Sequence, residues 1–141
     1  MKAVLLDTGP IVATLDAADP DHRFAVGGFE KISGQVVTTG AVVTEAMFFL
    51  QDLPGGPMRL VDWLAGIGAE IIDCFASDRV RRATELMERY SDTPMDFADA
   101  TLVVLAAHLD CGAILTLDER GFRTFRYHRR KSFRLLLQDA G

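Results

Sequence analysis

The most constraining feature of this sequence is the alternation of short apolar runs with longer helical segments. The runs that we expect to form strands are bounded by turn residues and lie at 3–6, 35–38, 69–74, 113–117 and 133–137. The segments between them with helical periodicity lie at 9–15, 20–31, 41–51, 57–67, 77–90 and 97–109. Continuous apolar strands separated by helices indicate a parallel sheet that is covered on both faces. The sequence therefore predicts an α/β protein, a three-layer α/β/α sandwich with a central, mostly parallel sheet.

The chain has 141 residues, without internal repeats or a linker-like segment, and we expect one domain over 1–141. No apolar run reaches the roughly 18–20 residues that a membrane span needs. The apolar start is interrupted at Asp7, too early for the core of a signal peptide, so we expect a cytoplasmic protein with no membrane contact.

The cysteine and histidine content argues against disulfide bonds and against zinc. Cys74 and Cys111 form no CxxC pair, and we expect both to be free buried thiols. His22, His108 and His128 are scattered, without the spacing of metal ligands.

Three acidic residues stand where water should be scarce. Asp7 ends the first predicted strand and Asp118 follows the strand at 113–117, so both belong to the carboxyl edge of the sheet, where α/β proteins bind ligands. Glu45 lies inside an apolar helix, where a carboxylate is unfavourable unless it is paired or bound to a cation. Each has a structural alternative: a helix cap for Asp7, a turn for Asp118, and a side chain that reaches solvent for Glu45.

Two further acids begin the longest apolar helix. Thr93 suits the N-cap of this helix, Pro94 its first position and Asp96 its third, which predicts a capping role for Asp96. Asp99 lies one turn later on the same face and has no such role.

Converging carboxylates would repel one another unless some are protonated or a cation lies between them. Oxygen ligands of this kind suit Mg²⁺ or Mn²⁺. Such a site supports hydrolysis of phosphodiesters, because the metal lowers the pKa of a bound water and offsets charge on the phosphate.

Four segments together resemble one known family. They lie in the same order and similar surroundings at 7–13, 44–46, 94–103 and 116–122. Their sequences are DTGPIVA, TEA, PMDFADATLV and TLDERGF. The chain resembles the PIN-domain family over nearly its whole length and, within that family, the VapC-type toxin ribonucleases of bacterial toxin–antitoxin pairs.

The resemblance implies a Mg²⁺-dependent (or Mn²⁺-dependent) endoribonuclease that hydrolyses RNA with a metal-activated water. The family's catalytic and metal-binding acids carry over onto Asp7, Glu45, Asp99 and Asp118. Residues that would orient a carboxylate or a water beside the metal are Asp96, Thr8 and Thr116. The implied partners are RNA, a small cognate antitoxin protein and a second copy of the chain as a homodimer.

The C-terminal part is strongly basic. The net charge is −5, yet residues 120–134 hold seven basic residues and no acid, which leaves −12 for the rest once +7 is subtracted from −5. The candidate contacts to RNA phosphates are Arg123, Arg126, Arg129 and Arg130. Docking of an acidic antitoxin segment and protection of an exposed strand edge are alternatives. Phe125 and Tyr127 lie among these residues and suit either base stacking or the core.

Other functions remain open. An aspartyl-phosphate phosphohydrolase would be expected to carry a second acid two residues after Asp7, where this chain has Gly9. No glycine–lysine loop for nucleotide phosphates is present. The two remaining alternatives are a stand-alone PIN-type nuclease in RNA processing and a catalytically silent binding module of the same fold.

Overall fold

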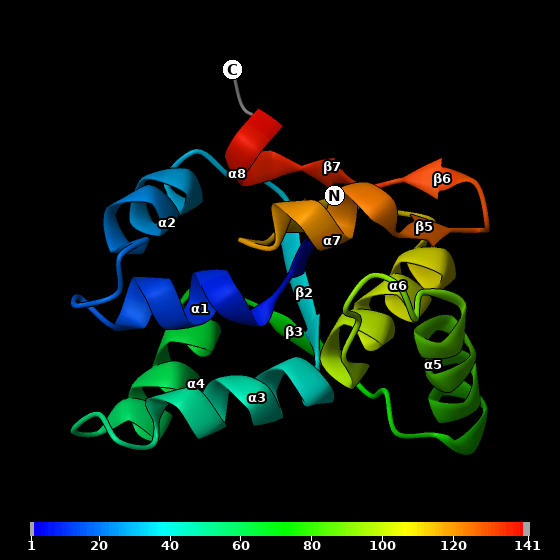
Figure 1. Cartoon of the computed structure of the whole chain (residues 1–141). Helices are drawn as coiled ribbons and strands as arrows, with labels where there is room; N and C mark the ends of the chain where they lie inside the picture. The colour runs from blue at the N-terminus through cyan, green and yellow to red at the C-terminus, as the bar shows by residue number, and fades with distance from the viewer. Residues whose placement is uncertain (1, 140–141) are drawn as a thin grey trace.

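A five-stranded parallel sheet forms the centre of the computed structural model, which describes residues 2–139 (Figure 1). Its strands are β1 (Ala3–Leu6), β2 (Gln35–Thr39), β3 (Glu70–Ile72), β4 (Ala113–Leu115) and β7 (Arg134–Leu135). They are ordered β3-β2-β1-β4-β7, and every neighbouring pair is parallel. The predicted architecture is confirmed.

Helices cover the sheet on two sides. One group contains α1 (Thr8–Leu15), α2 (His22–Phe29), α3 (Gly40–Leu50) and α4 (Gly56–Gly66). The other group contains α5 (Ser77–Arg89) and α6 (Phe97–Leu109), which pack against each other. Figure 1 shows the two groups on opposite sides of β2. None of the described helices is both long enough and apolar enough to cross a bilayer.

The middle of the sheet is the core, which explains why its strands are apolar without alternation. Leu5 pairs with Val37 of β2 on one side and with Ile114 of β4 on the other. Leu5 and Ile114 are fully buried because helices cover both faces of the sheet. From β1 the chain moves outward to β2, and it later returns to β4 on the other side of β1. This reversal of strand order is the place where open α/β sheets bind ligands, at the carboxyl ends of the strands.

The start of α6 differs from the prediction. Asp96, not Thr93, is the N-cap, and Asp99 is the third helical residue of a capping box. Asp is a stronger N-cap than Thr, and here two acids reciprocate across the first turn. The expectation that Asp96 is the third residue of the box, and that Asp99 has no local role, is therefore wrong.

The C-terminal part also differs. The expected strand at 133–137 shortens to β7, and α8 (Leu136–Asp139) follows it directly. The basic segment forms α7 (Glu119–Thr124) and an antiparallel hairpin of β5 (Arg126–Tyr127) and β6 (Lys131–Ser132). Its aromatic residues, Phe125 and Tyr127, are buried, so they belong to the core and do not offer faces for base stacking.

The two cysteines are free, but they are not equally buried. Cys74 is in the core, whereas Cys111 is only partly buried, which corrects the expectation for the second thiol. The Cys111 thiol donates a hydrogen bond to the Ala3 carbonyl, with 2.8 Å between Sγ and the oxygen.

Candidate active site

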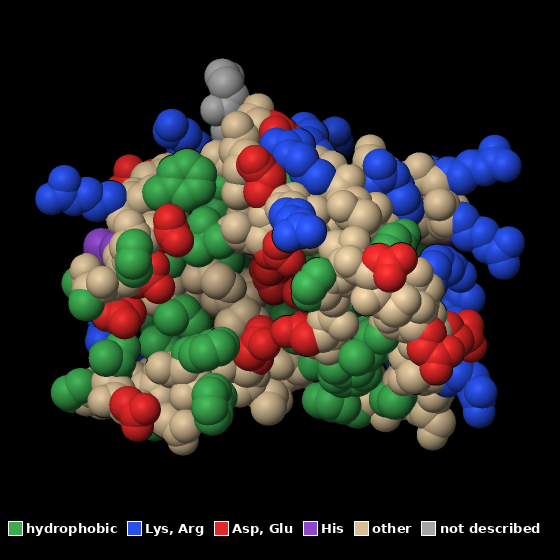
Figure 2. Space-filling view, viewed as in Figure 1, with side chains coloured by type: hydrophobic (Ala, Val, Ile, Leu, Met, Phe, Trp, Pro, Cys, Tyr) green, Lys and Arg blue, Asp and Glu red, His purple; other side chains and the backbone are tan. Residues whose placement is uncertain are grey.

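Acidic side chains gather in a hollow at the carboxyl edge of the sheet. Figure 2 shows this cluster near the centre of the face, with Lys and Arg side chains above it over α7. Asp7 follows β1, Asp118 N-caps α7 after β4, and Glu45 lies on α3. Asp96 and Asp99 come from the beginning of α6. Asp7, Asp96 and Asp118 each raise the pKa of at least one other acid of the group, and Glu45 and Asp99 have their own pKa raised by members of it, so the fold brings the five acids into one neighbourhood.

Asp7 is held by both of its carboxylate oxygens. Oδ1 accepts a hydrogen bond from the Thr8 N–H at 2.8 Å, as the N-cap of α1. Oδ2 accepts one from the Thr116 hydroxyl at 2.7 Å. The expected capping role therefore exists, and it also fixes the orientation of a buried carboxylate at the end of β1.

Thr116 connects the ends of two loops. Besides donating to Asp7, its Oγ1 accepts a hydrogen bond from the Asp118 N–H at 2.9 Å. Asp118 then accepts from the Gly121 N–H at 3.0 Å as the N-cap of α7. A Cβ at Gly121 would collide with the Asp118 carboxylate, so the glycine is required for this close approach.

Asp96 and Asp99 hold each other through backbone groups. The Asp99 N–H donates to Asp96 Oδ1 at 2.8 Å, and the Asp96 N–H donates to Asp99 Oδ2 at 3.2 Å. This reciprocal pair points both carboxyl groups out of the beginning of α6, where the helix dipole favours negative charge.

Glu45 is the fifth acid of the group and lies on α3. Its half-buried carboxyl lies near the Thr8 hydroxyl, which lowers its pKa, but burial raises that pKa more and Asp96 and Asp7 raise it further. Thr8 is buried, and within residues 2–139 its Oγ1 makes no hydrogen bond of ordinary geometry. A buried hydroxyl without a partner is unfavourable, and an additional ligand or water in the hollow would satisfy it.

Burial and mutual repulsion perturb the acids strongly. Burial is the main cause that raises the pKa of Asp7 to about 6, against the lowering effect of its bonds to Thr116 and Thr8. Burial is also the main cause that raises the pKa of Asp99 to about 8, followed by repulsion from Asp7 and Asp96. No cation of the described residues appears among the causes of these shifts.

The side chains of the hollow offer oxygen ligands, which suit a hard divalent cation, although these oxygens are not arranged around a single point. Among residues 2–139 no three Asp, Glu, His or Cys side chains have the geometry of a formed metal site. Backbone N–H groups occupy one oxygen each of Asp96, Asp99 and Asp118, and the second oxygen of each accepts no hydrogen bond from the described part of the chain. Those free oxygens, the half-buried Glu45 and the unpaired hydroxyl of Thr8 fit Mg²⁺ or Mn²⁺, which prefer oxygen ligands.

The four predicted RNA-contact arginines are not equivalent. Arg123 forms ion pairs with Asp139 at 2.8 Å and Glu119 at 3.7 Å. Arg126 donates through Nη1 to three carbonyl oxygens at the end of α7, the nearest at 2.8 Å, which is a structural role. Arg129 and Arg130 are exposed at the hairpin tip and form no ion pair with any described residue.

Sequence reasoning missed residues that support the site. The Gln138 side chain donates to the Thr116 carbonyl at 2.9 Å and ties α8 to the loop that carries Asp118. Thr39 caps α3, the helix that carries Glu45, and its hydroxyl bonds to that of Thr101 in α6 at 2.9 Å. Thr39 lies two residues before the predicted helix at 41–51 and was a detectable cap signal. Nothing in the sequence indicates the contact of Gln138.

Comparisons with known proteins give a matching family model, a similar sequence and a similar structure. The family model described as PIN domain matches residues 4–126. The chain is 30% identical over 125 residues to "Ribonuclease VapC26" of Mycobacterium tuberculosis (strain ATCC 25618 / H37Rv), covering 87% of this chain and 92% of that protein. The fold is similar to the crystal structure of M. tuberculosis VapC20, described as a Sarcin-Ricin loop cleaving toxin. The TM-score is 0.74 and the identity 18%, over 82% of this chain and 90% of the other.

Proposed function

The chain belongs to the PIN domain family, and from this premise we propose that it is a divalent-metal-dependent endoribonuclease, a single nuclease domain spanning residues 1–141. It hydrolyses RNA phosphodiester bonds in the acidic hollow, with Mg²⁺ or Mn²⁺ as its cofactor and the cytoplasm as its place of action. The relative named as a ribonuclease supports the reaction, and the hollow supports the metal.

One observation carries the proposal. Five acids from four helices and two strand ends meet in one hollow, and burial together with mutual repulsion raises the pKa of Asp99 to about 8. A fold that gathers carboxylates without a compensating cation stabilises their ionised forms only when a metal binds. Capping roles explain why Asp7, Asp96, Asp99 and Asp118 are present at their helices, but they explain neither Glu45, inside α3, nor why these helices begin at the same place.

The protein's own groups have distinct roles in this proposal. Asp7, Glu45, Asp99 and Asp118 hold the metal, and Thr116 keeps the Asp7 carboxylate oriented toward it. Thr8 and Asp96 lie beside them and position a water or a carboxylate. A bound divalent cation supplies a water of lowered pKa as the nucleophile and offsets the negative charge that develops on the phosphate.

The proposed partners follow from the relatives and from one surface. We infer a cognate antitoxin that holds the enzyme inactive, and a homodimer. Phe48, Phe49, Met58 and Val61 are exposed on α3 and α4, although large apolar side chains usually avoid water. A chain that acts alone in RNA processing would need no such antitoxin, and co-purification of the chain with the product of a neighbouring gene separates the two cases.

The test is cleavage of a structured RNA pool by purified wild type and Asp99→Asn, each with Mg²⁺ and with EDTA. Asn keeps an oxygen for the capping box but removes the charge, so folding is preserved while metal binding weakens. Asp62→Asn is the matched control, because Asp62 is exposed on α4 outside the hollow.

Cleavage that requires Mg²⁺, is lost in Asp99→Asn and survives in Asp62→Asn supports the proposal. The absence of cleavage by folded, partner-free wild type with Mg²⁺ and Mn²⁺ across several RNA pools contradicts it and favours a silent binding module. Equal activity of Asp99→Asn and wild type would remove Asp99 from the site.

A further inference from the structure

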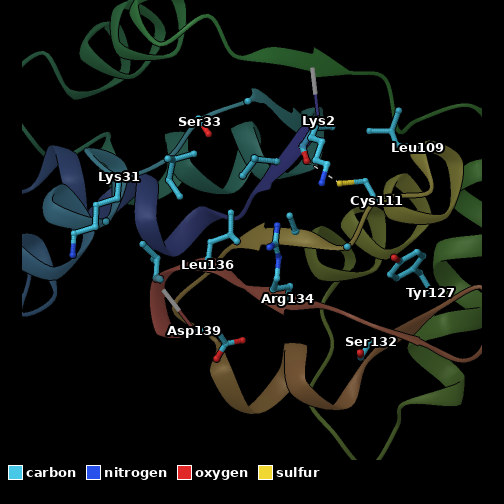
Figure 3. Close-up of a pocket in the computed structure, with 18 of the residues that line it drawn as sticks. Lys2, Lys31, Ser33, Leu109, Cys111, Tyr127, Ser132, Arg134, Leu136 and Asp139 are labelled. Carbon is cyan, nitrogen blue, oxygen red and sulfur yellow. Dashed lines mark hydrogen bonds between the residues drawn. The ribbon is translucent and has the colours of Figure 1, made fainter. Parts of the chain in front are cut away.

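A large cleft lies at the other end of the sheet, where the amino ends of β1 and β4 meet α2 and α8 (Figure 3). Its volume is about 1320 Å³, more than the roughly 300–1,000 Å³ of a typical small-molecule site. The acidic hollow does not use this cleft, because none of the five acids lines it. Its size suits a segment of a chain molecule.

The cleft is positively charged in a protein whose net charge is −5. Four exposed cationic side chains line it, namely Lys2, Arg23, Lys31 and Arg134. None of the four forms an ion pair with a described residue. Figure 3 shows Lys2 and Arg134 pointing into the middle of the cleft and Lys31 at its α2 side. Like charges that share a cleft without an acidic partner favour an anionic occupant.

The two acids that line the cleft do not neutralise these cations. Asp139 accepts from Arg123 at 2.8 Å, and Asp110 accepts from Lys131 at 2.9 Å. Both carboxylates are therefore engaged by cations of α7 and of the hairpin, and the four free charges remain available to a ligand.

Two short helices, α7 and α8, connect the acidic hollow with the cleft. Gln138 of α8 bonds to Thr116 in the hollow, whereas Leu136 and Asp139 of the same short helix line the cleft. Asp118 caps α7 in the hollow, and Arg123 of α7 reaches Asp139 at the cleft. Contacts of α7 and α8 therefore connect the hollow to the cleft.

We propose that the amino-edge cleft binds the flank of a single-stranded RNA whose scissile phosphate lies in the acidic hollow. This inference rests on the proposed ribonuclease function and adds a second contact region to it. Backbone phosphates pair with the four cations, and exposed Phe24, which also lines the cleft, offers a face for a base. In this arrangement the RNA runs over α7, along the Lys and Arg side chains that Figure 2 shows above the acidic cluster.

Gly27 provides a substitution that blocks the cleft without disturbing the fold. It lies in α2 and lines the cleft, and a Cβ built there meets no atom within 4 Å. Gly27→Glu therefore adds volume and a negative charge to the cleft, and Glu favours a helix more than Gly does. Gly66→Glu is the matched control, because Gly66 ends α4, meets nothing within 4 Å and does not line the cleft.

The experiment measures binding, so it does not depend on catalysis. Fluorescence anisotropy in EDTA compares a labelled single-stranded dodecanucleotide RNA with a tetranucleotide. We expect Gly27→Glu to weaken binding of the dodecanucleotide at least about tenfold and to reduce its advantage over the tetranucleotide, because a carboxylate repels the phosphates. Gly66→Glu should bind like wild type.

A second pair of variants measures the phosphate contact directly. Arg134→Ala should lower the slope of log affinity against log salt by about 0.7, the value for one contact to a single strand. The control is Arg81→Ala, since Arg81 is exposed on α5 and lines no part of the cleft.

The outcomes separate this inference from the proposed function. If Gly27→Glu binds the dodecanucleotide as tightly as Gly66→Glu while Mg²⁺-dependent cleavage persists, the function stands and the inference is refuted. If binding depends on the cleft but no metal or RNA pool gives cleavage, RNA binding by the cleft stands, whereas the proposed ribonuclease and the placement of a scissile phosphate in the hollow are refuted. A glutamate-rich peptide that binds in a Gly27-sensitive manner, when RNA does not, assigns the cleft to an acidic protein segment and refutes the RNA assignment.

Discussion

Without metal, this protein should become less stable as the pH rises, and Asp99→Asn should remove most of that loss. In the folded protein the pKa of Asp7 is raised to about 6 and that of Asp99 to about 8, both from 3.8. The unfolded chain therefore releases these protons near pH 4, while the folded chain keeps them longer. Because the folded state binds more protons in this window, the free energy of unfolding falls between about pH 4 and about pH 8.

The size of the effect follows from the two pKa values. A group that holds its proton only in the folded state contributes about 1.4 kcal/mol per pH unit. Between about pH 5 and pH 8, the folded state alone keeps the proton of Asp99 over three pH units and that of Asp7 over about one pH unit. Relaxation of the folded structure and entry of water into the hollow reduce the sum of these two contributions. We therefore expect the free energy of unfolding to fall by about 2–4 kcal/mol.

The assay is urea unfolding at several pH values in EDTA and in Mg²⁺, for wild type, Asp99→Asn and the exposed control Asp62→Asn. In EDTA the slope should be negative for wild type and Asp62→Asn and much smaller for Asp99→Asn, in which the raised pKa of Asp7 still contributes. Mg²⁺ should cancel the wild-type slope, because the metal binds the ionised carboxylates of the folded state. A wild-type stability that rises with pH in EDTA, or an unchanged slope in Asp99→Asn, would refute the reasoning.

Three further predictions test the support of the site. Thr116→Val removes a bond that lowers the pKa of Asp7, so the acidic limb of the pH profile for RNA cleavage should move to higher pH, while Thr116→Ser should restore it. Gly121→Ala should destabilise the fold by about 1–3 kcal/mol in thermal unfolding and reduce cleavage, because its Cβ displaces the Asp118 carboxylate. Arg129→Ala should lower the salt slope of RNA binding by about 0.7 if this exposed arginine contacts a phosphate, and an unchanged slope removes it from the interface.

The sheet and most helices were predictable because local pattern and tertiary position agree. The run from Ala3 to Leu6 is apolar at every position, which only a strand covered on both faces tolerates, and it forms the central strand. Asp7 was detectable for the same reason, since a charge directly after a buried run marks the end of a parallel strand.

The errors occur where neighbouring residues compete for one role. Thr93 and Asp96 both suit an N-cap, and only the reciprocal bond with Asp99, seen in three dimensions, decides between them. The hairpin after Phe125 was not predicted because its strands are two residues long and carry no alternation. Its turn has His128 and Arg129 at positive φ, a conformation that is uncommon for residues other than glycine and that the sequence therefore does not indicate.

Four of the five acids serve the fold as well as the proposed chemistry, whereas Glu45 was visible in the sequence because a carboxylate inside an apolar helix is unfavourable. Asp7, Asp96 and Asp118 are N-caps, so a backbone N–H holds one oxygen of each while the helix dipole favours its charge. The same caps place the beginnings of α1, α6 and α7 around one hollow, where burial and repulsion then oppose ionisation. A cap alone needs no such convergence, since Ser or Thr would serve each helix without repulsion. These helices therefore have acids rather than Ser or Thr as caps, although repulsion between the acids lowers the stability of the fold. A cation in the hollow accounts for the acids, whereas helix capping alone does not.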